Sequence, residues 1–283
     1  MTTLQKIVKY CAIAFAIFLI VSIIGGAVQA VASFSRCFDD DDDVLSEMKT
    51  TVISEEVRDL EIDLGGAELE IRTGSEFAVK SNHKYLETEN QNGCLRIIES
   101  RSIFWLDEDN VRVILTVPKN FTFKQVRIST GAGVMNIDTL LGENITMELG
   151  AGEVSVGCLE ASDRAKIDGG AGELTILDGS IHDLDMDLGI GEVIIKSRLT
   201  GNSCIDCGAG ELELTLFGSA EDYRITPDKV VGEALLDGKK MRDGETYGSG
   251  ENHVELNGGV GSIKVDFDQW KTDKDEKKEH VEK

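Results

Sequence analysis

Hydrophobic and polar residues alternate over short segments of this chain, and a period of two indicates β-strands. Ile145, Met147 and Leu149 follow that alternation toward the phrase Gly150-Ala151-Gly152. The next apolar residue of this alternating pattern, Val154, is five positions beyond Leu149. Since five is an odd number, the alternation of apolar and polar positions changes phase across the two glycines. A corner between two strands is therefore predicted there, where glycine tolerates φ values that bulkier residues resist.

This glycine corner recurs along the chain, usually followed by an acidic residue and two alternating apolar residues. The first glycines of the regular copies are Gly131, Gly150, Gly170, Gly189 and Gly208. They are separated by 19, 20, 19 and 19 residues, and diverged copies begin at Gly65 and Gly259. A period near 20 built from strands predicts an all-β fold, a parallel β-solenoid of about 19–20 residues per coil. A leucine-rich repeat, the nearest alternative, requires a helix-like half and an asparagine ladder, and the repeat has neither.

The segments around the regular coils carry weaker signals. Strands are predicted over 110–117 and 121–130, on either side of Pro118, and a hairpin turn at Asn92-Gly93. Residues 218–250 contain several loop signals, including Asp237-Gly238. The last strand, Gly261 to Phe267, is predicted to close the stack.

An uncharged apolar segment precedes the repeats. No charged side chain occurs from Tyr10 to Ser35, a length that spans a hydrocarbon core of about 30 Å as a helix. We predict a cytoplasmic N-terminus (1–9), a transmembrane helix (10–35), an acidic linker (36–56), the solenoid domain (57–268) and a disordered charged tail (269–283). The basic residues before the apolar segment favour an inside N-terminus and an extracytoplasmic domain, in a single-pass protein of the cell membrane. A signal peptide cleaved near Ala30 or Ala32 is the alternative.

The charge balance restricts the partners. The formal net charge is −23, from 52 acidic and 29 basic residues, and such a field repels the phosphates of nucleic acid. Cations, cationic peptides and basic protein surfaces are the partners that it attracts. Cys204 and Cys207 form a C-x-x-C, but strand periodicity places one thiol in the core and the other on the surface, against a redox or zinc site.

Aligning the coils produces two acidic columns beside the corner, and the parity of the strands places both on the outside. One column stands two residues before the first glycine and the other three residues after it. The members are Asp63, Glu148, Asp168, Asp187 and Asp206 in the first, and Glu68, Glu153, Glu173, Glu192 and Glu211 in the second. Neighbouring carboxylates about 4.8 Å apart repel by about 0.9 kcal/mol per pair in water. Such columns either collect Ca²⁺ or cationic groups of a partner, or are simply a solvated acidic face.

Catalytic signals are weak, because the histidines lie outside the repeat phrase and no hydrolase, metalloprotease or P-loop motif occurs. The acidic residues recur coil after coil, whereas a catalytic pair is a local exception to a repeat. We therefore expect no enzyme activity, no resident cofactor and no catalytic residue. A carboxylate-based polysaccharide-cleaving enzyme is the less favoured alternative.

The chain resembles a bacterial family of β-strand-repeat domains of unknown function that carries the label "putative adhesin". The similarity covers roughly residues 57 to 268. It rests on the strand–proline lead-in 113–118, the serial G-x-G-E-[VL]-x-[IV] coils and the terminal phrase 258–263. The resemblance implies a membrane-anchored, adhesin-like binding or scaffold protein with a protein or glycan partner at the cell surface. An accessory component of an envelope-stress or signalling system is the alternative that it implies.

Overall fold

The computed structural model describes residues 48–100 and 111–268. The chain divides into two units, Met1–Met48 and Lys49–Lys283, and only the second is described below. The predicted cytoplasmic segment, transmembrane helix and charged tail, and most of the predicted linker, lie outside the described residues. Within the described ranges, no helix combines the length and the hydropathy that a membrane crossing requires.

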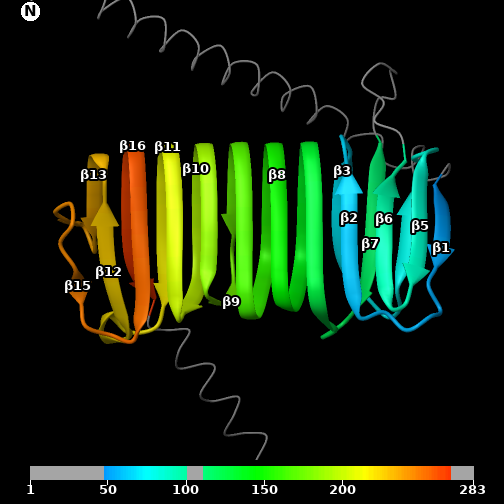
Figure 1. Ribbon diagram of the computed structural model, residues 1–283, viewed down its shortest axis with the longest axis horizontal. Coiled ribbons are helices and arrows are strands. Elements are labelled where there is room, and N and C mark those ends of the chain that lie inside the picture. The colour runs from blue at the N-terminus through cyan, green and yellow to red at the C-terminus, as the bar shows by residue number, and fades with distance from the viewer. Residues whose placement is uncertain (1–47, 101–110, 269–283) are drawn as a thin grey trace, which may run out of the picture. The chain divides into compact units, whose positions relative to one another are not determined.

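The described unit is a stack of β coils joined in one hydrogen-bonded sheet, which confirms the all-β solenoid (Figure 1). Its regular middle consists of β8 (Thr122–Ile176), β9 (Gly179–His182), β10 (Leu184–Thr200) and β11 (Asn202–Phe217). The described residues contain one short 3₁₀ helix, η2 (Ala220–Asp222), and no α-helix.

Neighbouring coils pair in parallel, with equivalent repeat positions opposite each other. Gly191 of β10 pairs with Gly172 of β8 on one side and with Gly210 of β11 on the other. The glycine corners therefore align along the axis of the stack, as the repeat predicts. One coil cannot bury its apolar residues alone, and the coils on either side cover them. Contacts between neighbouring coils therefore stabilise the stack.

Aliphatic side chains form ladders inside the stack. Ile167 pairs with Met186, Met186 with Ile205, and Ile205 with Leu256, and all four are fully buried. Burial of one such side chain stabilises the fold by about 1.5–3 kcal/mol. The ladders run through all the layers as one continuous core.

At the N-terminal end of the stack, the order of layers differs from the order of the sequence. β2 (Asp59–Leu64) pairs with both β6 (Cys94–Glu99) and β8, and β3 (Glu68–Gly74) pairs with both β7 (Arg112–Pro118) and β8. The first coil of the chain, β2–β3, is therefore enclosed between the β6–β7 coil and the regular stack.

Antiparallel strands cover this end. β5 (Leu86–Gln91) forms a hairpin with β6, and β4 (Ala78–Ser81) pairs with β7. The hairpin turn is Asn92-Gly93, with φ of 55° and 82°, as predicted. β1 (Lys49–Val52) pairs with β4 although it lies in the predicted linker, so ordered structure begins before residue 57. Alternation of side chains is too short in this segment to indicate a strand, and its pairing with β4 supplies the order.

The C-terminal end repeats the arrangement and corrects one prediction. β16 (Asn252–Asp268) does not close the stack, because it pairs with β11 on one side and with β12 (Tyr223–Asp228) and β13 (Val231–Leu236) on the other. Residues 218–250, predicted as loops, thus hold the outermost coil. Two short strands, β14 (Lys239–Lys240) and β15 (Tyr247–Gly248), cover the edges of that coil. Gly232 pairs with Gly261, so the corner column continues through a copy of the phrase in which Val230 replaces the first glycine.

Candidate binding edge at the glycine corners

The second glycine of each corner is required by the close approach of neighbouring coils. Gly210 has a φ of +143°, and a Cβ atom built on it would lie 1.7 Å from the carbonyl oxygen of Gly191. Gly191 has the same relation to Gly172, and Gly261 to Gly210. Any side chain there clashes with backbone, so glycine is needed both for φ and for space.

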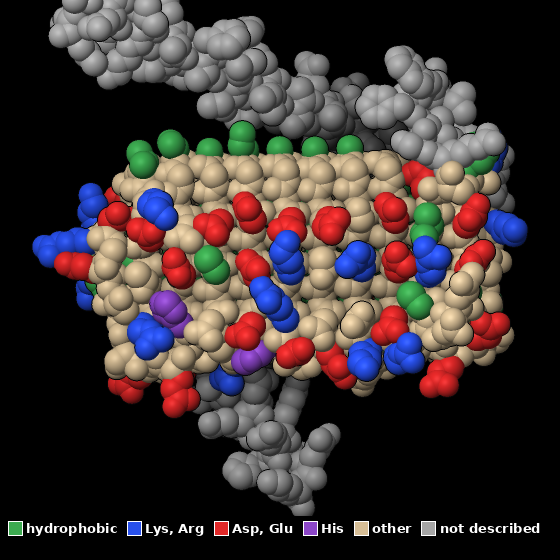
Figure 2. Space-filling view, viewed as in Figure 1, with side chains coloured by type: hydrophobic (Ala, Val, Ile, Leu, Met, Phe, Trp, Pro, Cys, Tyr) green, Lys and Arg blue, Asp and Glu red, His purple; other side chains and the backbone are tan. Residues whose placement is uncertain are grey.

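The residue between the two glycines is apolar and faces outward in every regular coil. These residues form a continuous line across the layers, which we name the corner ridge: Ala132, Ala151, Ala171, Ile190, Ala209, Val260 and Val231. Figure 2 shows apolar side chains in a row along one edge of the stack. Ile190 is 52% exposed, Val260 64% and Val231 65%. These three side chains contribute little to the core, so packing does not explain their apolar character.

The two acidic columns flank the ridge, and the structure brings most of their predicted members together. Asp187 pairs with Asp168 and Asp206, and Glu192 pairs with Glu173 and Glu211. Glu148 and Glu153 are exposed on the preceding coil of β8. Figure 2 shows a row of acidic side chains below the apolar row.

The columns end at the coils that begin at Gly131 and Gly259, which have no acidic residue at the column positions. Asp63 lies opposite Ser129, and Glu68 lies opposite Arg112, so neither continues the run of carboxylates. At the other end, Asp206 and Glu211 lie opposite Asn257 and Ser262. These interruptions are visible in the sequence, because the copies at Gly131 and Gly259 carry Ser129, Val134, Asn257 and Ser262 at the column positions.

Only two members of the columns are neutralised by a cation among the described residues. Nε of Arg112 lies 2.9 Å from Glu68, and Nζ of Lys166 lies 2.5 Å from Asp168. The rest of the described column, including Glu173 and Glu192, has no basic side chain within ion-pair distance. The edge therefore retains a strong negative potential on both sides of the ridge.

A shallow groove of about 600 Å³ runs beside the ridge on the side of the first column. Its lining includes the carboxylates of Glu148, Asp168 and Asp187, with Leu149 and Gly169 between them. Among the described residues, no group of three or more acidic, histidine or cysteine side chains is placed to hold a metal ion. The acids form lines, whereas Ca²⁺ requires six to eight converging oxygens.

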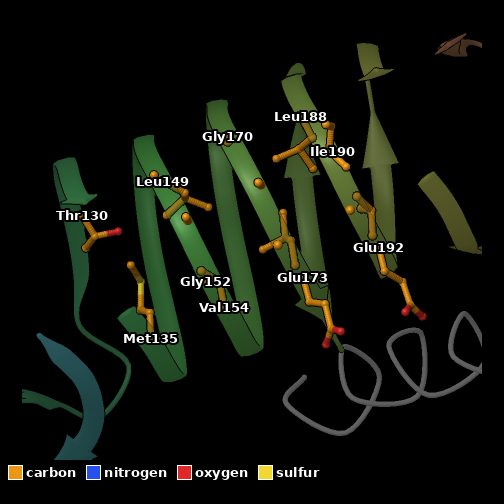
Figure 3. Close-up of a pocket in the computed structure, with 18 of the residues that line it drawn as sticks. Thr130, Met135, Leu149, Gly152, Val154, Gly170, Glu173, Leu188, Ile190 and Glu192 are labelled. Atoms are coloured by element: carbon orange, nitrogen blue, oxygen red, sulfur yellow. The ribbon is translucent and has the colours of Figure 1, made fainter. Parts of the chain in front are cut away.

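The interior below the ridge is tightly packed. A narrow cavity of about 40 Å³ lies inside the corners, and Leu149 and Leu188 are part of its lining. Glu173 and Glu192 also line it, and their carboxylates point outward (Figure 3). Gly169 stands where neighbouring coils have leucine, and a Cβ atom there would lie 2.1 Å from Cδ2 of Leu188. Leu188 thus fills the space that Gly169 leaves, and the edge offers no deep pocket for a small ligand.

The thiols of the C-x-x-C point to opposite faces, as predicted. Cys207 packs against the core, whereas Sγ of Cys204 contacts Oδ2 of Asp206 at 3.6 Å and accepts a hydrogen bond from Nδ2 of Asn257 at 3.4 Å. Burial, reinforced by Asp206, raises the pKa of each thiol to about 11. Both thiols remain protonated at neutral pH, which disfavours metal binding and nucleophilic chemistry.

The described histidines lie apart and do not form a site together. His83 is buried, with Nε2 3.6 Å from Oε1 of Glu99, and its Nδ1 accepts a hydrogen bond from the Tyr85 amide. Oε2 of Glu99 accepts a 2.7 Å hydrogen bond from the amide of Gly65. This pair ties the outer coil to the β2–β3 corner. Sequence reasoning missed the pair, since residues 74–109 show no repeat from which to align it.

Sequence reasoning also missed the corner ridge as a surface. The signal was present, because the residue between the glycines is apolar in every regular copy, but only the acids were aligned. Fold and edge together define a repetitive all-β domain with an elongated, acidic and apolar surface.

The chain belongs to the Toastrack DUF4097 family, whose model matches residues 57–233. This confirms the family resemblance inferred from the repeat. The family is defined by its domain, and its function is unknown. No curated protein matches the chain.

Several solved structures are similar at low identity. A "putative cell adhesion protein" of Clostridium sporogenes is 15% identical, with coverage of 78% of this chain and 99% of that chain and a TM-score of 0.37. A "putative adhesin" of Bacteroides fragilis is 12% identical, with coverage of 77% and 96% and a TM-score of 0.30. A "putative lipid binding protein" of Parabacteroides distasonis is 13% identical, with coverage of 79% and 97% and a TM-score of 0.34. Scores this low carry no argument about ligands or partners.

Proposed function

We propose that this protein is a membrane-anchored, extracytoplasmic binding or scaffold protein of adhesin type, which presents its glycine-corner edge to a partner at the cell surface. The proposal depends on one observation, the repetition of the same exposed side chains along the edge, coil after coil. Repetition of a surface over many layers suits an extended contact with a macromolecule, as in other solenoid proteins.

We further propose that the domain is not an enzyme. The carboxylates of the edge repeat in evenly spaced lines, and the groove beside them is shallow and open. A catalytic site requires a local constellation with perturbed groups in an enclosed cleft. The anchor enters the proposal from the charge-free segment 10–35, which has the length of a membrane span.

Cells that express the full chain with a C-terminal tag test both parts of the proposal. We expect the tag to be cut by protease added to intact cells, and the uncut chain to fractionate with membranes. We also expect these cells to adhere to an immobilised surface protein or glycan. Substitution of Glu173→Gln and Glu192→Gln should weaken that adhesion without changing the amount of chain at the surface.

Two outcomes contradict the proposal. Protection of the tag from external protease in intact cells excludes an extracytoplasmic domain. Cleavage of a glycan by the purified chain, lost in Glu173→Gln or Glu192→Gln, indicates an enzyme instead of a binding protein.

A further inference from the structure

The corner ridge has the properties of a contact surface and not of a packing device. Ile190, Val231 and Val260 are more than half exposed, and each pairs along the ridge with another apolar residue. Single exposed aliphatic residues are ordinary, but a line of apolar residues at one outward position of every layer marks an interaction site. Within this line only Ala171 and Ala209 are partly covered.

The charges around the ridge exclude two occupants. A second copy of this edge would place its carboxylates against Glu173, Glu192 and Glu211, and like charges in contact are unfavourable. An anionic membrane surface is repelled for the same reason. Charge complementarity instead selects a partner with basic groups on both sides of an apolar centre.

The backbone of the edge selects the conformation of that partner. The ladder from Ile190 to Ala171 and Ala209 already uses the hydrogen-bonding groups of neighbouring coils, so a partner strand has no free edge to pair with along the ridge. An α-helix satisfies its own backbone and binds through side chains alone. A helix is therefore the element that this surface accepts.

The dimensions agree. Seven ridge positions at about 4.8 Å per layer span about 29 Å, which equals about 20 residues of helix. The second acidic column is two residues from the ridge and the first column three residues, or about 7 and 10 Å of strand. Lysine or arginine side chains flanking the apolar face of a helix about 10–12 Å wide reach both columns.

We propose that the corner ridge, with the acidic columns on either side, binds a cationic amphipathic helix of a partner protein. The apolar face of the helix lies on the ridge, and basic side chains on one flank enter the groove lined by Glu148, Asp168 and Asp187. This inference rests on the proposed function and names the chemistry of the partner.

The test uses the full chain in nanodiscs of zwitterionic lipid and a fluorescent 20-residue peptide of leucine and lysine, with all leucines on one helical face. Fluorescence anisotropy measures the dissociation constant, and empty nanodiscs give the lipid contribution, which is the same for every variant. We expect saturable binding that weakens at least tenfold in the triple variant Ile190→Gln, Val231→Gln, Val260→Gln. The control, Val52→Gln with Leu177→Gln, changes apolar residues that are 54% and 45% exposed and lie away from the ridge, and it should alter the affinity less than twofold.

A peptide of the same composition with its leucines scattered separates the helix from simple charge attraction. We expect it to bind at least tenfold more weakly. Equal binding of the scattered peptide, or unchanged affinity in the triple variant, overturns the inference. The proposed function survives that result if cells still adhere and lose adhesion in Glu173→Gln or Glu192→Gln. Failure of the helix inference and failure of the proposed function are therefore distinguishable.

Discussion

At the scale of single residues, the second glycine of each corner is the least replaceable position in the repeat. Its φ lies in a region that other residues rarely adopt, and a carbonyl oxygen of the coil below occupies the place of a side chain. The ridge residue one position earlier is unconstrained by comparison, because it points into solvent. One corner thus combines a fixed position with a free one.

Gly191→Ala should destabilise the fold by at least about 3 kcal/mol, because it adds strain at φ +155° and a Cβ atom 1.7 Å from the oxygen of Gly172. Urea denaturation measures the loss. Gly238→Ala is the control, since Gly238 has a φ of +70° but no atom near its Cβ position. It should cost about 1 kcal/mol. Equal costs would show that conformation alone, without close stacking, requires the corner glycine.

The thiols of Cys204 and Cys207 should react slowly with iodoacetamide in the folded protein. A pKa of about 11 leaves about a thousandth of each thiol ionised at pH 8, against a large fraction in the unfolded chain. Peptide-resolved mass spectrometry should therefore find labelling on the order of a hundredfold faster in urea at pH 8. Rapid labelling of either cysteine in the folded state would contradict its protected environment.

The same shift has a consequence for stability, with a definite sign. The folded state holds the thiol protons more tightly than the unfolded chain, whose cysteine pKa is about 8.5. The contribution of the protonated thiols to the stability of the fold is therefore fully present below pH 8.5, and it is lost as the pH rises toward 11. The free energy of unfolding should decline over this alkaline range.

At the scale of elements, the regular coils were predictable because one repeat carries all the information for its neighbours. The alternation of Ile145 and Met147 and the glycines at 150 and 152 predict a strand, a corner and a stacking partner at once. The outermost coil was not predictable in that way. In the phrase Val230-Val231-Gly232-Glu233-Ala234 a valine replaces the first glycine, and the surrounding Asp-Gly turns outweighed the remaining signal.

Leu256→Ala on β16 should cost about 3 kcal/mol, because this side chain is fully buried between Ile205 and Pro227. Leu235→Ala on β13 is the matched control, since Leu235 is only partly buried on the outer coil and should cost less than about 1.5 kcal/mol. Thermal unfolding or urea titration compares the two variants. If β16 were instead the last layer of the stack, both variants should lower the free energy of unfolding by similar, small amounts.

At the scale of the described unit, the order of the layers could not be predicted from the sequence. The phrases at Gly65 and Gly259 indicate coils, but not that each coil lies one layer inside its end of the stack. Chain order is the natural default for a repeat. The pairings at the two ends depart from it, where β2 pairs with β6, β3 with β7, and β16 with β12 and β13. The positions of the acidic columns were likewise predicted, but the prediction treated each column as continuous from the first coil onward.

Ending the chain after Gly250 should destabilise both sides of the missing layer. β11 and the β12–β13 coil each lose their long parallel partner, so amide protons of Leu212 and Leu214 should exchange much faster. Ending the chain after Asp268 is the control and should leave the exchange of these amides unchanged. Unchanged protection in the shorter chain would mean that the outer coil docks directly on β11.

The inward position of both terminal coils also determines how such an array changes its length. A coil added beyond either end would have to displace the antiparallel strands that cover that end, which are β1, β4 and β5 at one end and β14 and β15 at the other. A complete unit of 19 or 20 residues inserted between β8 and β11, in contrast, meets the same neighbours as the units already there. The length of the glycine-corner edge can therefore change by insertion or deletion of whole coils in the middle of the stack, while both ends remain covered.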